Sequence, residues 1–154
     1  TFSGLNGNVD QVYRVLIRMT TTAAAGKYMY LKPNNDGTSN NYISGRHQLG
    51  LSASNTWHDT AYIYGSNGII VAFAGFGADY IWSDFHIYAQ SGMTRPYVGF
   101  TWCNDDNPTS NFASYHIGGC WRDTSANLTS LVFSWESGDG TGAIWLWRGL
   151  TPPM

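Results

Sequence analysis

The chain has 154 residues, which is enough for one domain with a two-layer core. Only 12% of the residues are charged, the formal net charge is -2, and aromatic residues make up 16%. The eight Lys and Arg are scattered, which disfavours a nucleic-acid role, because phosphate binding needs a concentrated basic surface. No apolar run approaches the roughly 20 residues of a membrane-spanning helix, so membrane insertion is not expected.

The composition predicts an all-β protein. Helix-building residues are scarce, since the chain has a single Glu, Glu136, and two Lys, Lys27 and Lys32. Gly, Asn, Ser and Thr are abundant, as expected for many short strands joined by polar turns. The chain starts at Thr1 without Met, which indicates a processed form or a piece of a longer protein.

Ten strands are expected, separated by turns about every ten residues. In chain order they are residues 11–19, 28–32, 42–51, 61–64, 69–74, 78–90, 96–103, 113–122, 129–135 and 143–148. Gly65-Ser66-Asn67-Gly68 predicts a hairpin between the fourth and the fifth. Trp145 and Trp147 are expected on one face of the last strand. This pattern favours one antiparallel two-sheet β-sandwich or barrel over residues 1–154 rather than any α/β arrangement.

The segment 78–90 is expected to be a central strand around which the others are laid. Its alternate residues form two different sets. The small or apolar set, suited to a buried face, is Ile81, Ser83, Phe85, Ile87 and Ala89. The mixed aromatic and polar set, suited to a wetted face or an interface, is Tyr80, Trp82, Asp84, His86 and Tyr88.

The two cysteines are expected to be free thiols. If residues 96–103 and 113–122 are neighbouring antiparallel strands, Cys103 pairs near Ala113 and Cys120 pairs near Tyr97. The two sulfur atoms are then too far apart for a disulfide.

No catalytic residue is expected. Glu136 lies in a Gly-rich turn and no Asp is marked as its partner, whereas a glycosidase usually needs two carboxylates a few ångström apart. The chain has no Gly-x-Ser-x-Gly nucleophile elbow and no glycine-rich phosphate loop.

No metal ligand is assigned either. The four histidines lack zinc-type spacing. Asn34-Asn35-Asp36-Gly37 and Asn104-Asp105-Asp106-Asn107 offer oxygen ligands for calcium, the one ion that the sequence leaves open. Asn and Asp also favour turns for backbone reasons alone.

Aromatic residues beside polar residues are the best candidates for ligand binding. Sugar rings have apolar C–H faces that stack on Trp or Tyr, and Asp, Asn and Arg orient their hydroxyl groups. Trp57-His58-Asp59, Trp121-Arg122-Asp123 and Trp102 before Asn104 offer such pairs at predicted loops or strand ends. The candidate ligand-binding residues are Trp57, Asp59, Asp105, Asp106, Trp121 and Arg122. The alternative is that these tryptophans fill the core or a subunit interface.

Several segments resemble a C-terminal domain of tailed-phage tail fibres and tailspikes. They are Thr1-Phe2-Ser3-Gly4-Leu5-Asn6-Gly7-Asn8-Val9-Asp10, Val12-Tyr13-Arg14-Val15-Leu16, Tyr30-Leu31-Lys32-Pro33-Asn34-Asn35-Asp36, Ser83-Asp84-Phe85-His86-Ile87-Tyr88-Ala89-Gln90-Ser91-Gly92 and Thr129-Ser130-Leu131-Val132-Phe133. In order and spacing the similarity covers nearly the whole chain. The motifs are structural turns and core strands, and they bring no catalytic residue.

The resemblance implies a sandwich of jelly-roll type, a homotrimer on the phage tail, outside the cell, and recognition of bacterial surface polysaccharide. The first hypothesis is therefore a non-enzymatic receptor-binding domain without a cofactor. The second is a structural virion domain that drives trimerisation or decorates the capsid or tail. The third is a free-standing carbohydrate-binding module or a glycan hydrolase, for which Glu136 is the best residue.

Overall fold

The computed structural model describes residues 1–21, 27–38, 40–50, 59–65, 68–74, 80–104 and 112–149. The strands are β1 (Phe2–Ser3), β2 (Val12–Thr21), β3 (Lys27–Pro33), β4 (Tyr42–Gly50), β5 (Asp59–Gly65), β6 (Ile69–Ala74), β7 (Tyr80–Tyr88), β8 (Arg95–Asn104), β9 (Phe112–Trp121), β10 (Ser130–Trp135) and β11 (Gly140–Arg148). The helical turn α1 spans Gly7–Asp10. In these ranges no helix has the length and apolar content needed to cross a membrane.

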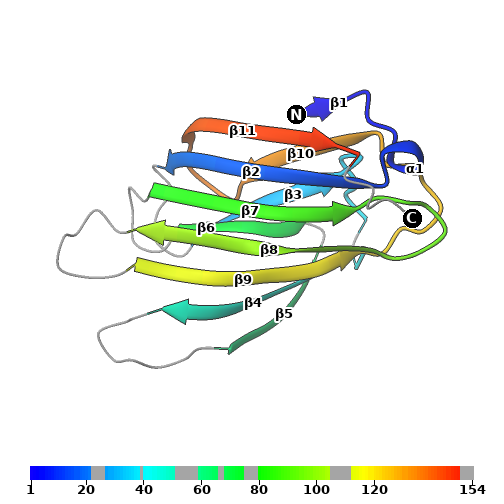
Figure 1. Ribbon diagram of the computed structural model, residues 1–154. Coiled ribbons are helices and arrows are strands. Elements are labelled where there is room, and N and C mark those ends of the chain that lie inside the picture. Colours follow the sequence, from blue (N-terminus) through cyan, green and yellow to red (C-terminus); the bar gives the residue numbers. More distant parts are fainter. Residues whose placement is uncertain are drawn as a thin grey trace.

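The strands form two antiparallel sheets, packed face to face (Figure 1). Among the described residues, the smaller sheet has the order β1-β10-β3-β6 and the larger has the order β11-β2-β7-β8-β9-β4-β5. The chain passes repeatedly between the two layers, while β7, β8 and β9 form a meander within the larger one. The predicted antiparallel two-sheet β-sandwich is therefore confirmed.

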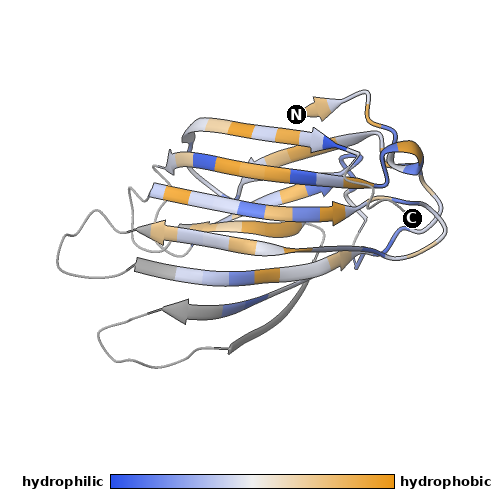
Figure 2. Cartoon of the chain, in the orientation of Figure 1, coloured by the Kyte–Doolittle hydropathy of each residue, from blue (hydrophilic) through white to orange (hydrophobic). Residues whose placement is uncertain are grey.

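The strand predicted as central is β7, which lies inside the larger sheet between β2 and β8. Ile81, Ser83 and Phe85 are at most 2% exposed, and the hydroxyl of Ser83 donates to Thr101 Oγ1 at 2.7 Å. Tyr80 and Trp82, from the other set, are exposed. Figure 2 shows hydrophobic and hydrophilic residues alternating along β7. The two faces predicted for this strand are confirmed.

The predicted hairpin between residues 61–64 and 69–74 is wrong. β5 pairs with β4 in the larger sheet, whereas β6 pairs with β3 in the smaller one. The Gly-rich segment indicates a change of chain direction, but it does not specify the sheet that the next strand joins. Ile69, Ile70 and Val71 are all buried, and in the smaller sheet β6 packs against β4, β7, β8 and β9 of the larger one.

The two cysteines form no disulfide, as predicted. Cys103 lies opposite Ala113, the position expected from an antiparallel β8–β9 pair. Cys120 lies opposite Pro96, one residue from the expected partner Tyr97. The two thiols are thus at distant points along the same strand pair.

At one end of the sandwich, a buried tryptophan is held between two charged side chains. Trp121 is 1% exposed, and its indole Nε1–H donates to Asp36 Oδ2 at 2.9 Å. The guanidinium carbon of Arg95, itself 1% exposed, lies 4.5 Å from the centre of the Trp121 ring. We call Asp36, Arg95 and Trp121 the Trp121 cluster.

Arg95 links the cluster to the neighbouring loops. Its guanidinium donates to the backbone carbonyls of Ala89, Asp123 and Ala126. Burial lowers the pKa of Arg95, and the nearby charge of Asp123 partly offsets this effect. These carbonyls lie outside the sheets and have no ladder partner, so the arginine satisfies polar groups that would otherwise be costly to bury.

Asp36 gathers donors from three directions. Oδ2 also accepts from the Asn41 side chain at 2.7 Å, and Oδ1 accepts from the Thr38 backbone N–H at 2.8 Å. Burial alone raises the pKa of Asp36, but the hydrogen bonds from Asn41, Trp121 and Thr38 outweigh it and lower the pKa from 3.8 to about 2. The ionised carboxylate is therefore the form that the fold stabilises.

This pKa predicts a specific loss of stability in acid. Because the folded-state pKa of Asp36 is below its unfolded value, its contribution is complete above about pH 4 and is lost as the pH falls through about 2. We expect Asp36→Asn to lower the free energy of unfolding at pH 7 by about 1–3 kcal/mol and to flatten its decline below pH 4. Urea denaturation at pH 7, 4 and 2.5 measures both effects.

Tyr42→Phe is the matched control. The Tyr42 hydroxyl donates to the backbone carbonyl of Asp36 at 2.6 Å and does not contact its carboxylate. This variant should lower stability by about 1 kcal/mol at every acidic pH, without changing the slope. An unchanged slope in Asp36→Asn would show that Asp36 does not carry the acid sensitivity.

Candidate functional site

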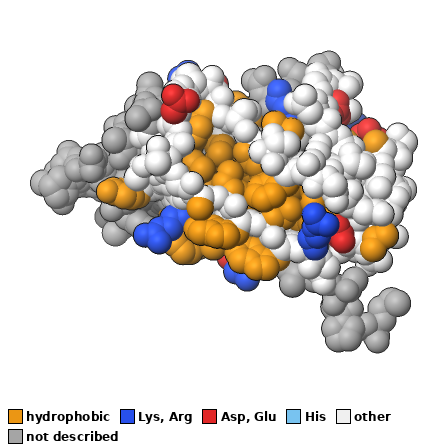
Figure 3. Space-filling model, turned by 90° about the horizontal axis from the view of Figure 1, so that it is seen from above, with side chains coloured by type: hydrophobic (Ala, Val, Ile, Leu, Met, Phe, Trp, Pro, Cys, Tyr) orange, Lys and Arg blue, Asp and Glu red, His pale blue; other side chains and the backbone are white. Residues whose placement is uncertain are grey.

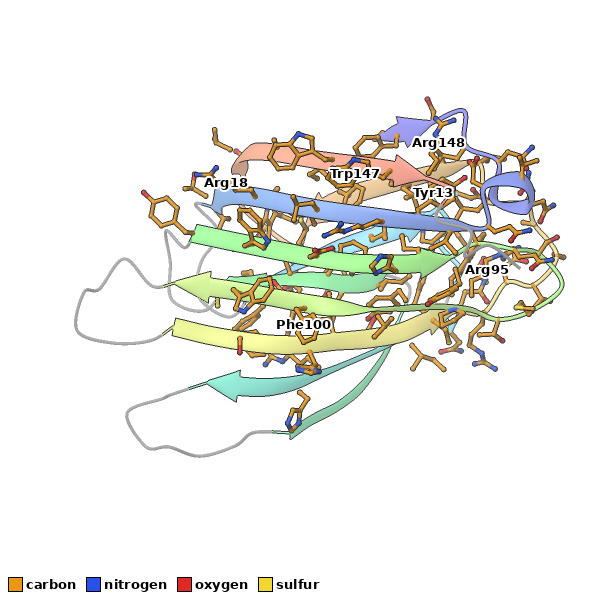
Figure 4. The ribbon with its side chains drawn as sticks, viewed as in Figure 1. Tyr13, Arg18, Arg95, Phe100, Trp147 and Arg148 are labelled. Atoms are coloured by element: carbon orange, nitrogen blue, oxygen red, sulfur yellow. The ribbon has the colours of Figure 1, made fainter. Side chains whose placement is uncertain are left out.

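The outer face of the larger sheet, which points away from the core, carries a band of exposed aromatic side chains. Tyr80 and Trp82 on β7, Phe100 on β8, and Trp145 and Trp147 on β11 are each at least 41% exposed. In Figure 4, Phe100 and Trp147 lie on the same side of this sheet. Exposed rings gathered on one face indicate a binding surface, because isolated exposed apolar residues would be scattered over the molecule.

Part of this band surrounds a cavity of about 580 Å³. The cavity lies at the end of the sheet where β2 and β8 end and β7 and β11 begin. We call it the aromatic groove, and it is lined by Arg18, Met19, Thr20, Tyr80, Ile81, Trp82, Trp102, Cys103, Thr141, Gly142, Ala143 and Trp145. Four aromatic rings around one concavity can hold an apolar or ring-shaped ligand.

The strand register places the key side chains in a row across the sheet. Trp82 on β7 lies opposite Arg18 on β2 and opposite Trp102 on β8. Residues directly opposite on adjacent strands are about 5 Å apart, so a guanidinium and two indoles follow one another across the sheet.

Small residues on β11 keep this row accessible. Arg18 lies opposite Ala143, whose side chain is a single methyl group. A Cβ at Gly142 would lie 2.2 Å from the carbonyl oxygen of Arg18, so no other residue fits there. The absence of a side chain at Gly142 lets β11 approach β2 closely.

Arg14 and Arg18, two arginines on the outer face of the larger sheet, differ in whether an acidic side chain pairs with them. Arg14 donates to Asp84 through Nε at 3.0 Å and through Nη2 at 2.6 Å. The hydrogen bond and charge of Arg14 lower the pKa of Asp84, although burial opposes the shift. Arg18, on the same strand and the same face, has no ion pair with any described acid. Of the described residues that line the groove, Arg18 alone is charged.

Two histidines lie beside the aromatic band. His116 and His47 face each other on β9 and β4 with ring centres 6.4 Å apart, and the Phe100 ring lies 4.3 Å from that of His116. Among the residues that the structure describes, no group of three His, Cys, Asp or Glu side chains could hold a metal. The pair therefore extends the aromatic surface away from the groove.

The first candidate calcium loop has its oxygen atoms turned toward protein donors. Asn34 Oδ1 accepts from the backbone N–H groups of Thr129 and Ser130, and both carboxylate oxygens of Asp36 accept N–H donors. Asn34 and Asn35 also have positive φ values of 53° and 54°, as expected for a tight turn. This loop therefore acts as a structural turn. Of the second loop, residues 105–107 lie outside the described residues.

Of the six sequence-predicted site residues, only Trp121 and Arg122 have described side chains, and neither lines the groove. Trp57, Asp105 and Asp106 lie outside the described residues. Asp59 is the first residue of β5, on the opposite edge of the sheet from β11, and its side chain is not described.

Trp121 and Arg122, the other two predicted residues, lie at the far end of the domain from the groove. Trp121 is buried in the Trp121 cluster, so its ring offers no face for stacking a sugar. Arg122 is exposed, and its guanidinium donates to the carbonyl of Asn40 at 3.4 Å.

The groove was missed because sequence reasoning placed the ligand on loops. Two signals pointed to it, namely the aromatic set on one face of the strand at 78–90 and the shared face of Trp145 and Trp147. Both were visible in the alternation, but only the strand order places β11 two strands from β7.

Glu136, the best residue for a hydrolase, lies outside the groove. Its side chain forms an ion pair with Lys27 at 3.5 Å, in the turn between β10 and β11. No described carboxylate is paired with it, as a two-carboxylate mechanism would require.

Comparison of the chain with protein-family models, with curated proteins and with solved structures finds no match. The functional argument therefore depends on the geometry of the groove and on the charges around it.

Substitution of Trp121 separates the two candidate sites. Trp121→Phe removes the hydrogen bond to Asp36 and leaves a small void, so we expect it to lower the free energy of unfolding by about 1–3 kcal/mol. Ligand binding measured well below the melting temperature should remain unchanged. If a folded Trp121→Phe protein lost ligand binding, the binding site would lie in the loops around residue 121 and not in the groove.

Proposed function

We propose that this chain is a non-enzymatic glycan-binding domain and that the aromatic groove is its binding site. The observation that carries the proposal is the set of four rings, from Tyr80, Trp82, Trp102 and Trp145, around one concavity on an exposed sheet face. Flat apolar rings on a rigid sheet match the C–H faces of sugar rings and require little reorganisation when the ligand binds.

The resemblance of several segments to tail-fibre and tailspike domains supports a more specific form of the proposal. In that form the domain is the receptor-binding part of a phage tail protein, and its ligand is a polysaccharide of the bacterial surface. The low charge of the chain fits an extracellular virion protein whose solubility depends on Gly, Asn and Thr rather than on ions.

Trp145 and Trp147 provide a matched test of the binding site. They lie on the same strand and the same face and are 41% and 44% exposed, but only Trp145 lines the groove. We expect Trp145→Ala to weaken binding to purified bacterial capsular and O-antigen polysaccharides about tenfold or more, because a stacking ring is lost. Trp147→Ala should bind as the unmodified chain does.

Isothermal titration calorimetry against a panel of such polysaccharides measures both variants, and urea denaturation checks that they are equally stable. Equal losses of affinity in the two variants would remove the groove from the proposal. A panel with no binding to the unmodified chain would contradict glycan recognition itself.

A second candidate function, a structural virion domain that trimerises, is favoured by the edge of the sandwich near β11 and β1. Viewed from above, hydrophobic side chains gather on this edge (Figure 3). The partly buried apolar residues on these strands and on β10 are Phe2, Phe133, Trp135, Ile144 and Leu146. β11 pairs only with β2 among the described strands, so its outer edge leaves backbone donors and acceptors for another chain.

The mass in solution tests this second candidate. Association through the β11 edge predicts a homotrimer, with three times the single-chain mass of 17.0 kDa, in light scattering over a range of concentrations. A single-chain mass at every concentration would contradict the structural function while leaving the glycan proposal intact.

A further inference from the structure

Arg18 differs from three other arginines of the chain, whose guanidinium groups lie near aromatic rings. The guanidinium carbons of Arg14, Arg46 and Arg95 lie within 6 Å of described rings, at 5.8 Å from Trp147, 4.2 Å from Phe73 and 4.5 Å from Trp121. Arg18 lies over no described ring, although Trp82 is its direct neighbour on β7. Its guanidinium keeps its planar face and its five donors for another partner.

Arg14 shows what Arg18 lacks. The two arginines lie four residues apart on β2, on the same face of the sheet, and both are exposed. Arg14 has a carboxylate partner, because Asp84 on β7 accepts two of its N–H groups. Across from Arg18, β7 provides Trp82 and β11 provides Ala143, and neither offers an acceptor for a guanidinium.

The electrostatic consequence is a positive charge at an apolar concavity. Apart from Arg18, the described lining contains no Asp, Glu, Lys or His side chain. Asp84, an acid on this face of the sheet, is already paired with Arg14. A ligand that stacks on the rings displaces water around Arg18, and an anionic group on that ligand compensates the lost hydration.

We propose that the glycan bound in the aromatic groove carries a carboxylate on its sugar ring, as uronic and sialic acids do, and that Arg18 binds this carboxylate. This inference depends on the proposed glycan-binding function. The planar guanidinium matches a carboxylate with two parallel N–H···O bonds. Adjacent strands are about 4.8 Å apart, so a sugar stacked on Trp82 brings a ring substituent within reach of Arg18 (Figure 4 labels Arg18).

The test compares acidic polysaccharides with their neutral derivatives. The probes are polygalacturonate and polysialic acid, each beside its carboxyl-reduced form, with dextran and galactan as neutral glycans. The proteins are the unmodified chain, Arg18→Gln, Arg18→Lys and Arg122→Gln. Arg122 is an exposed arginine at the opposite end of the domain, so its variant has the same change of charge away from the groove.

Calorimetry should show that carboxyl reduction and Arg18→Gln each weaken binding about tenfold. The two changes together should cost no more than either one, because they remove the same interaction. Arg18→Lys should recover part of the affinity, Arg122→Gln should have no effect, and an increase from about 0.05 M to about 0.5 M NaCl should weaken only binding that includes the Arg18 contact.

Three results would overturn the inference. One is equal binding of the acidic and carboxyl-reduced forms. Another is a loss in Arg18→Gln that is equally large for both forms. The third is binding to the neutral glycans alone. If Trp145→Ala abolished that binding, the proposed glycan-binding function would still stand. Binding to neither the acidic nor the neutral glycans would contradict the proposed function and this inference together.

Discussion

The Trp121 cluster is the interaction on which one end of this sandwich depends. Burying an arginine is expensive unless its donors are satisfied. Here Arg95 donates to loop carbonyls while lying against one face of Trp121, and Asp36 accepts the indole N–H. Sheets alone do not fix the loops between them. The cluster fixes three of these loops to one ring, so a tryptophan that looked suited to a ligand serves as the anchor of the fold.

With the loops at that end committed to structure, the exposed sheet face becomes the natural place for recognition. Side chains on a strand are held by the ladder of hydrogen bonds and by their cross-strand neighbours, and they keep their relative positions without extra support. Trp82 and Trp102 are aligned by register, and Arg18 continues the same row. A rigid row of this kind binds an extended ligand at a small cost in conformational entropy.

The low charge of the chain makes each unpaired ion informative. In a surface rich in Lys and Glu, one arginine without a partner would mean little, since exposed ion pairs contribute little energy. Here Arg14 and Asp84 neutralise each other, and the groove retains a single cation among its described lining residues. Arg18 would attract a carboxylate at the same place where the rings of the groove stack on a sugar. The position of the groove on the sheet is therefore connected with the class of ligand that it would bind.

The sequence by itself determined the all-β class, the positions of the strands to within a few residues, the two faces of β7 and the absence of a disulfide between Cys103 and Cys120. These features depend on local propensity and on a side-chain period of two, which are readable along the chain. Tertiary structure alone decided that β5 and β6 belong to different sheets, that Trp121 is buried, and that β11 lies beside β2. Strand order depends on which apolar faces cover one another across the whole domain. The groove depends on that order, because its rings come from three separate strands and Trp145 lies far along the chain from Trp82.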